Sequence, residues 1–86
     1  MTQRYAVIIA PRARKQIDKL QPAMKEHLAN ALEALACDPH AGKALQWDLK
    51  GLYSCRVGDF RVIYHIVKNK LIVEIVKVMH RREAYR

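Results

Sequence analysis

The stretch that decides the fold is Arg56-Val57-Gly58-Asp59-Phe60-Arg61. Its two central residues have the composition of a two-residue hairpin loop, and apolar residues stand on both sides of that loop. In such a hairpin the second pair outward from the loop places Arg56 directly opposite Arg61. Two like charges across a ladder destabilise a sheet. A pair of this kind is typical of a site that holds an anion, and phosphate is the first anion to consider in a chain of net charge +8.

Alternating residues on both sides of the loop predict three successive antiparallel strands over 52–57, 60–67 and about 71–79. Residues 68–70 supply the second turn. The middle strand has one clean apolar face, which we assign to the helices, and one mixed face, which Arg56 shares through the hairpin register. The apolar face comprises Phe60, Val62, Tyr64 and Ile66, and the mixed face comprises Arg61, Ile63, His65 and Val67.

Residues 5–10 form a short apolar run that predicts a buried strand, and two helices follow it. Pro11 suits the first turn of the first helix, and Gln21-Pro22 ends it and starts the second. Asp38-Pro39 ends the second helix, because the residue before proline is pushed out of the helical region. Residues 40–51 read as a loop or a short irregular strand. The expected buried positions are Ala13, Ile17 and Leu20 in the first helix and Met24, Leu28, Ala31, Leu32 and Leu35 in the second.

The predicted order is strand, helix, helix and three strands, which defines an α+β fold with two N-terminal helices packed on a four-stranded, mainly antiparallel sheet. The 86 residues form a single domain, since there is no room for a second core. The helices cover one face of the sheet. The other face is left partly open and carries the arginine pair.

Basic residues outnumber acidic ones by sixteen to eight, and the excess is concentrated in the part of the chain that reads as sheet. From residue 43 onward there are ten basic and four acidic residues, a surplus of six. Such a field suits nucleic acid, an anionic membrane or an acidic protein. No apolar run is long enough to cross a bilayer. We expect a cytoplasmic protein with no membrane partner and with Cys37 and Cys55 reduced.

The chain ends in the polar sequence His80 to Arg86. Because the last strand runs antiparallel to the middle one, its end returns to the hairpin. Arg56, Arg61 and Arg81 then converge, with His80 and Tyr85 as further candidates for the same basic pocket. A slip of one residue at the second turn would weaken this convergence.

Converging arginines suit a phosphodiester, because the planar guanidinium binds phosphate oxygens bidentately and keeps its charge. They also stabilise the extra negative charge of a pentacoordinate phosphorane. RNA carries its own nucleophile, the 2′-hydroxyl, so that only a base and an acid remain to be supplied. His80 has a suitable pKa for either role. Tyr85 is a candidate base if flanking arginines favour its phenolate.

Simpler interpretations stand beside these. Arg56 and Arg61 could be splayed, solvated side chains or ion-pair partners of Asp59, and His80 alone is typical of a surface or capping histidine. Tyr64 reads as core. The remaining histidines have no ligand spacing with the cysteines, which argues against a metal site. We expect neither a metal nor a cofactor.

Taken together, the motifs resemble the RelE/ParE superfamily of bacterial and archaeal type II toxins. The resemblance spans nearly the whole chain, and its middle block and its ending are specific for the superfamily at this mutual spacing. The matching segments are Pro11-Arg12-Ala13, Lys19-Leu20, Asp38-Pro39, Leu49-Lys50-Gly51-Leu52-Tyr53, residues 56–64 and His80-Arg81-Arg82-Glu83-Ala84-Tyr85.

The resemblance implies a microbial-RNase-like fold that cuts mRNA in the ribosomal A site without a metal. Attack by the 2′-hydroxyl would leave a 2′,3′-cyclic phosphate and a 5′-hydroxyl. The implied partners are a cognate RelB-like antitoxin, mRNA on the ribosome and ribosomal RNA. Operator DNA would be reached only through the antitoxin.

By position, Arg61 and Arg81 match the RelE arginines that bind the scissile phosphate, and Arg81 is also a proposed general acid. Tyr85 matches a C-terminal tyrosine proposed as base or as stacking platform. Arg56 stands where RelE has a lysine. Lys50 and Arg82 are further candidate phosphate ligands.

Two positions depart from the RelE pattern. Ser54 replaces a second lysine, so that one charge of the pocket is missing, and His80 also replaces a lysine. Both leave the assignment of acid and base open. The alternatives are a ParE-like inhibitor of DNA gyrase without catalysis and a non-toxic, degenerate member bound to its antitoxin. Arg61, Arg81 and Tyr85 together favour the RelE branch.

Overall fold

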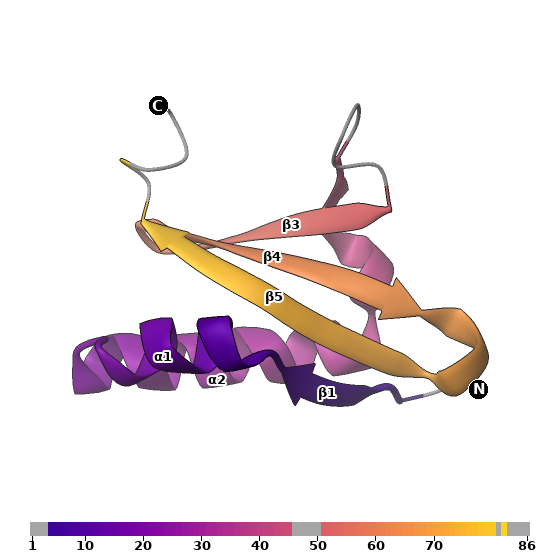
Figure 1. Ribbon diagram of the computed structural model, residues 1–86, viewed down its shortest axis with the longest axis horizontal. Coiled ribbons are helices and arrows are strands. Elements are labelled where there is room, and N and C mark those ends of the chain that lie inside the picture. Colours follow the sequence, from indigo (N-terminus) through magenta and orange to yellow (C-terminus); the bar gives the residue numbers. More distant parts are fainter. Residues whose placement is uncertain (1–3, 46–50, 81, 83–86) are drawn as a thin grey trace.

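The computed structural model describes residues 4–45, 51–80 and 82 and has two helices packed on a mixed sheet (Figure 1). The sheet order is β1-β5-β4-β3-β2, with β1 parallel to β5 and the other neighbours antiparallel. In chain order the elements are β1 (Ala6–Ile9), α1 (Pro11–Asp18), α2 (Pro22–Cys37), the 3-10 turn η1 (Pro39–Ala41), β2 (Lys43–Ala44), β3 (Leu52–Val57), β4 (Phe60–Val67), the 3-10 turn η3 (Lys68–Lys70) and β5 (Ile72–His80).

The predicted α+β class is confirmed, with one strand more than the four expected. The additional strand is β2, which pairs Lys43 with Ser54 and Ala44 with Tyr53 at the edge of the sheet. It falls within residues 40–51, for which the sequence predicts a loop or a short irregular strand. Two residues are too few to show an alternating pattern, and the pairing partner on β3 is what makes them a strand.

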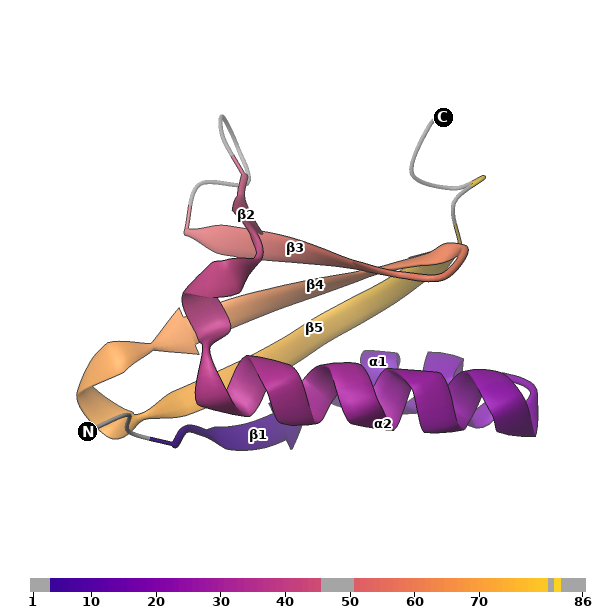
Figure 2. The same cartoon turned by 180° about the vertical axis from the view of Figure 1, so that it is seen from behind.

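Proline residues define the helix boundaries as expected. Pro11 and Pro22 occupy the first turns of α1 and α2, where a missing backbone N–H costs nothing. Helix α2 ends at Cys37, because Asp38 precedes Pro39 and has left the helical region, with φ −148° and ψ 77°. Helix α2 lies behind the sheet in Figure 1 and in front of it in Figure 2, so that it covers one face.

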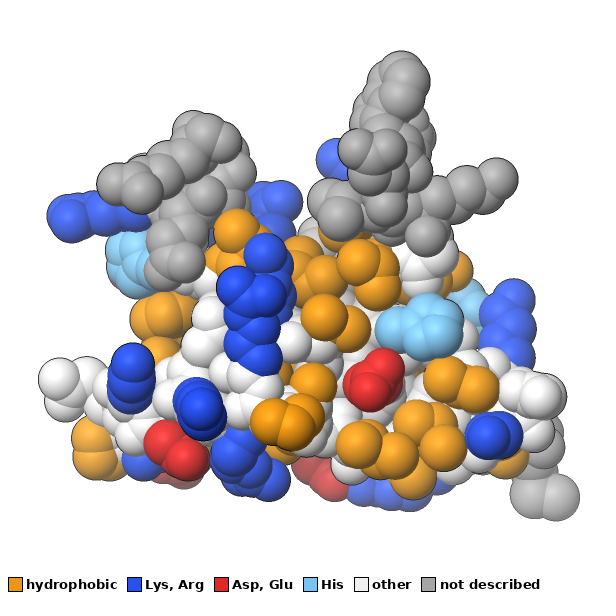
Figure 3. Space-filling model, in the orientation of Figure 1, with side chains coloured by type: hydrophobic (Ala, Val, Ile, Leu, Met, Phe, Trp, Pro, Cys, Tyr) orange, Lys and Arg blue, Asp and Glu red, His pale blue; other side chains and the backbone are white. Residues whose placement is uncertain are grey.

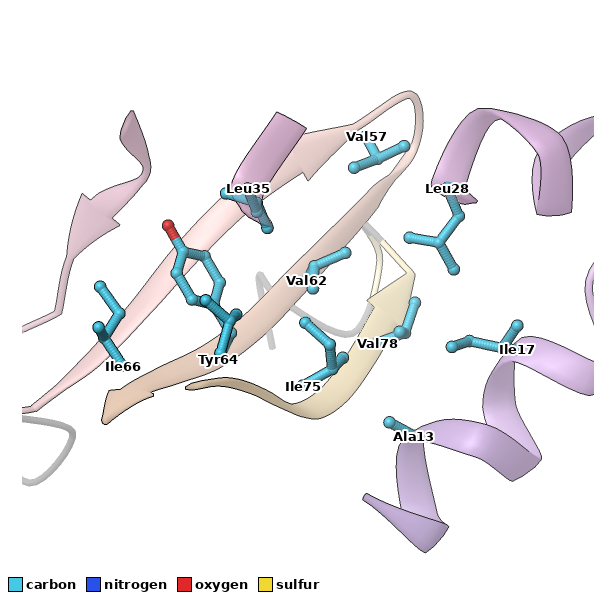
Figure 4. Packing of buried hydrophobic residues seen from close by; sticks show 11 residues of the cluster. Ala13, Ile17, Leu28, Leu35, Val57, Val62, Tyr64, Ile66, Ile75 and Val78 are labelled. Carbon is cyan, nitrogen blue, oxygen red and sulfur yellow. The ribbon is translucent and has the colours of Figure 1, made fainter. Parts of the chain in front are cut away.

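The core lies between that face and the helices (Figure 4). Ala13, Ile17, Leu28 and Leu35 are buried as predicted, whereas Leu20, Met24, Ala31 and Leu32 pack against the core and remain partly exposed. The prediction of a buried strand near the N-terminus is wrong: β1 lies at the edge of the sheet and contains no buried residue, and Ile8 is 47% exposed. Ile63 is expected on the mixed face of the sheet, and it is buried as well, with 7% of its surface exposed. The central cluster consists of Ala13, Ile17, Leu28, Leu35, Val57, Val62, Tyr64, Ile66, Val73, Ile75 and Val78.

The hairpin between β3 and β4 has the predicted register. Val57 pairs with Phe60, and Arg56 pairs with Arg61. Gly58 has φ +58°, a left-handed conformation that favours glycine. The two-residue loop therefore fixes the two arginines as direct neighbours across the ladder.

A β-bulge interrupts the pairing of β4 with β5. Ile63 pairs with Lys77 whereas Tyr64 pairs with Ile75, so that Val76 is the extra residue on β5. Ile75 and Val78 both belong to the core. The two residues between them therefore both lie toward the open side of the sheet, where strict alternation would place only one. The backbone N–H of Val78 donates to Gln16 Oε1 at 2.8 Å, which ties α1 to β5 beside the bulge.

Tyr64 is a core residue, as predicted, and not a base. Its ring is fully buried and stacks on Tyr53 with the ring centroids 5.7 Å apart. Its hydroxyl donates to the Pro39 carbonyl oxygen at 2.7 Å, which ties β4 to η1. Burial raises the pKa of Tyr64 to about 12.

This pKa predicts a loss of stability at alkaline pH. In the unfolded chain a tyrosine ionises near pH 10, whereas in the folded state Tyr64 holds its proton to about pH 12. The buried, protonated Tyr64 therefore makes its full contribution to the free energy of unfolding below pH 10. This contribution, about 2–3 kcal/mol in total, is lost as the pH rises from 10 to 12. Urea unfolding between pH 9 and 12 measures it, with Tyr64→Phe as the comparison. If both proteins lose stability equally over this range, the assignment to Tyr64 is wrong.

Candidate functional site

The face of the sheet opposite α2 carries the arginine pair. The register places Arg56, Arg61 and Met79 side by side on β3, β4 and β5. Arg56 is exposed, and Arg61 is half-buried. The three residues form the row of this face that lies next to the hairpin loop, which we call the arginine row.

Within the described residues, neither arginine of this row has an ion-pair partner. The recorded ion pair joins Arg4 to Glu33, and its hydrogen bond lowers the pKa of that carboxyl group. The alternative pairing with Asp59 is not observed in this part of the chain. The two guanidinium groups are therefore available to an external anion, which would relieve their mutual repulsion.

Further cations lie close to the arginine row. In the next row, Lys43, Ser54, Ile63 and Lys77 lie side by side across β2, β3, β4 and β5. The position where the family pattern has a lysine is occupied here by the uncharged and buried Ser54, so it contributes no charge to this face. Figure 3 views the molecule from the side opposite α2 and shows hydrophobic side chains interspersed with basic ones.

An apolar pocket of about 310 Å³ opens beside the arginine row. It shares Met79 with that row, and Ile63 belongs to the adjacent one. Two of the residues around it are cationic. The pocket is lined by Arg12, Leu52, Ile63, Val76, Lys77 and Met79.

His80 lies at the predicted end of β5, opposite Phe60 and beside the hairpin. Its ring contacts the Phe60 ring edge-on, with the centroids 5.1 Å apart, and its Nδ1 accepts a hydrogen bond from the Arg82 backbone N–H at 3.2 Å. It lines a different pocket, of about 380 Å³, together with Gln16 and Lys19 of the α1 region. The structure therefore does not bring His80 onto the face that carries Arg56 and Arg61.

Of the remaining predicted site residues, Arg82 belongs to the described part of the chain and the others do not. Arg82 is exposed and follows His80 closely. Lys50, Arg81 and Tyr85 lie outside the described residues, and their roles remain predictions. Among residues 4–45, 51–80 and 82, no three His, Cys, Asp or Glu side chains are grouped in a way that could hold a metal ion.

The sequence reasoning missed three cations of this region: Arg12, Lys43 and Lys77. Lys77 reaches the open face through the bulge, and Lys43 through the edge strand β2. Arg12 lies in this region because β1 pairs with β5 and the chain turns directly from β1 into α1. The sequence holds no clear signal for the bulge, because Ile75, Val76, Val78 and Met79 are all apolar and fit a strand in either register.

In the part of the chain that the structure describes, neither helix has the length and apolar character needed to cross a membrane.

Comparisons with known proteins agree on one family. Residues 7–85 match the family model described as the ParE toxin of the type II toxin–antitoxin system parDE. The toxin RelG of Mycobacterium tuberculosis is 33% identical over 84 residues, which cover 95% of this chain and 97% of that protein. The toxin–antitoxin complex RelBE2 of the same organism contains a chain with a TM-score of 0.84 and 32% identity, covering 91% of this chain and 99% of its own. A chain of the archaeal RelE–RelB complex from Pyrococcus horikoshii has a TM-score of 0.75 and 27% identity, with 94% and 97% covered.

Proposed function

The chain belongs to the RelE/ParE superfamily and is a type II toxin, and from this premise we propose that it is a ribosome-dependent, metal-independent mRNA endonuclease. Its substrate would be the mRNA strand in the ribosomal A site, and its cleavage would stop translation in the cytoplasm. The identities of 33% and 32% to toxins with Rel names support this branch of the superfamily.

The observation that carries the proposal is the arginine row. Arg56 and Arg61 are direct neighbours on a face with further cations, and neither is paired within the described residues. Two guanidinium groups on directly paired residues suit the non-bridging oxygens of one phosphodiester. Their interaction strengthens as the phosphorane gains charge, which lowers the barrier.

In the proposed reaction, the 2′-oxygen attacks phosphorus and forms a new P–O bond while the bond to the 5′-oxygen breaks. The 2′-hydroxyl proton passes to a base, and the leaving 5′-oxygen takes a proton from an acid. The products are a 2′,3′-cyclic phosphate and a 5′-hydroxyl. From the family resemblance we assign the phosphate contacts to Arg61 and Arg81. Tyr85 is the candidate base, and Arg81 is also a candidate acid.

The position of His80 argues for a supporting role. Its ring contacts Phe60 on the helix side of the sheet, and its Nδ1 accepts a hydrogen bond from the Arg82 backbone N–H. Through these contacts it would orient the backbone that leads to Arg81. Lys50 and Arg82 remain candidates for contacts with flanking phosphates.

We also propose a RelB-like antitoxin as the partner that holds the toxin inactive. The similar chains from M. tuberculosis and P. horikoshii both come from toxin–antitoxin complexes, the second with RelB. The net charge of +8 favours an acidic partner segment, and operator DNA would be reached through the antitoxin.

Toe-printing of ribosomes on a defined mRNA tests the proposal. Purified protein is expected to produce cleavage within the A-site codon, in the presence of EDTA as well as in its absence, and none in the same mRNA without ribosomes. Because ribosomal contacts would neutralise phosphates, the effect should decline steeply with added salt. Absence of A-site cleavage at low salt would refute the proposal.

A second candidate function is inhibition of DNA gyrase, which the family model's description as the parDE toxin favours. Expression of the toxin would then induce the DNA-damage response and leave mRNA intact. An mRNA nuclease would instead stop protein synthesis without that response. Supercoiling assays with purified gyrase distinguish the two directly.

A further inference from the structure

We propose that the apolar pocket beside the arginine row binds one nucleobase of the RNA strand whose phosphate the arginines hold. This inference rests on the proposed function and adds a base subsite to it. The pocket volume of about 310 Å³ lies at the lower end of the range of ~300–1,000 Å³ for small-ligand sites.

The position of the pocket connects it to the phosphate site. Arg61 and Ile63 are two residues apart on β4 and lie on the same face, which separates their positions by about 7 Å. Met79 belongs to both the arginine row and the pocket, since it pairs with Arg61 and lines the pocket. A nucleotide can therefore place its phosphate at the arginine row and its base in the pocket.

The walls suit the flat face of a base. Ile63 is 7% exposed and forms a firm apolar surface. The thioether of Met79 is polarisable and packs favourably on aromatic rings. Proteins that recognise single-stranded RNA bind unstacked bases in this way, by apolar and stacking contacts.

The charge around the pocket favours a polyanion over an apolar peptide. Arg12 and Lys77 both line it, and Glu74 is the one acidic residue that the described pairing places on this face. A guanidinium plane stacks on a base or contacts a flanking phosphate.

The pocket exists because of the bulge on β5. Val76 and Lys77 line it together, which strict alternation along the strand would prevent. Bulges are frequent beside active sites, where they redirect a side chain. Here the bulge supplies one wall and one cation from consecutive residues.

Methyl NMR of the purified full-length toxin tests the subsite without ribosomes. The ligand is a 2′-O-methyl trinucleotide, which cannot be cleaved, and the matched ligand is the same backbone with abasic positions. At millimolar concentration the trinucleotide is expected to shift the methyl signals of Ile63, Val76 and Met79, and the abasic ligand is not. Equal shifts with both ligands would overturn the proposal, as would unshifted signals.

A matched pair of variants completes the test. Val76→Trp fills the pocket, whereas Val67→Trp makes the same change on the same sheet face away from it. Val76→Trp is expected to weaken trinucleotide affinity by about 10-fold, the value of one base stacking contact, while Val67→Trp leaves it unchanged. Comparable losses in both variants would contradict the subsite.

The outcome is separable from that of the proposed function. A gyrase inhibitor would show neither A-site cleavage nor base-dependent shifts. A nuclease whose pocket binds the antitoxin would cleave mRNA, and its pocket methyl signals would respond to the antitoxin and not to the trinucleotide, which refutes the subsite alone.

Discussion

Arg61→Ala is expected to lower A-site mRNA cleavage by about 10²- to 10³-fold, the loss found when one group that stabilises a developing charge is removed. Arg61 is half-buried, lies on the central strand β4 and has no ion-pair partner in the described part of the chain. Its truncation removes a positioned, permanently charged fork that no neighbour in β4 can replace. Cleavage in the toe-printing assay measures the effect, and the rescue of growth on expression of the variant reports it in cells.

Two further variants separate charge from geometry. Arg61→Lys keeps the charge and loses the bidentate fork, so that its activity should lie between those of the wild type and Arg61→Ala. Arg14→Ala removes the same charge from an exposed position on α1 and should cleave normally. Arg56→Ala should cost less than Arg61→Ala, because the Arg56 side chain is exposed.

Antitoxin binding serves as the folding control for these proteins. Arg61→Ala should bind the cognate antitoxin with unchanged stoichiometry and unfold at the wild-type urea concentration, since its side chain is outside the core. A folded Arg61→Ala toxin that cleaves at the wild-type rate would remove the arginine row from the mechanism.

The hairpin could be predicted from the sequence because its cause is local. A two-residue loop containing Gly58 fixes the register, and the register fixes which residues face each other. The buried stripes of the helices followed in the same way from period and from proline positions. In each of these cases a few neighbouring residues determine the geometry.

The bulge on β5 could not be predicted in the same way, and it decides the position of His80. Strict alternation from the core residue Ile75 would place His80 on the open face beside Arg61. The extra residue Val76 reverses the faces after it, so that Met79 faces the open side and His80 faces Phe60. The position of the bulge depends on packing against α1, where Gln16 Oε1 accepts a hydrogen bond from the Val78 N–H. No local pattern encodes that contact.

Gly42→Ala is expected to destabilise the fold by about 3 kcal/mol, toward the upper end of the cost of overpacking. The backbone of Gly42 is ordinary, with φ −75° and ψ 176°, so that conformational strain plays no part. The cause is space: a Cβ there would overlap Tyr64 Oη and lie 2.8 Å from the Ser54 carbonyl oxygen. Neither can give way easily, because Tyr64 is fully buried and its hydroxyl is bonded to Pro39.

Thermal unfolding measures this effect, and Gly58→Ala is the matched control. Gly58 has φ +58°, and an added Cβ would meet only the flexible end of Met24, at 3.4 Å. Its replacement should therefore cost the strain of a left-handed alanine, about 1 kcal/mol. For a domain of this size Gly42→Ala should lower Tm by about 12–24 °C, and Gly58→Ala by about 4–8 °C.

A double-mutant cycle with Tyr64→Phe identifies the clash. Removing the hydroxyl eliminates the atom that overlaps most, so that Gly42→Ala should cost less in the Tyr64→Phe protein than in the wild type, by about 1 kcal/mol or more. Part of the cost should persist, because the Ser54 carbonyl oxygen and the Tyr64 Cζ, at 3.0 Å, remain in place. Additive effects of the two substitutions would show that Gly42 and Tyr64 do not contact each other as described, and the link between η1 and β4 would then need another explanation.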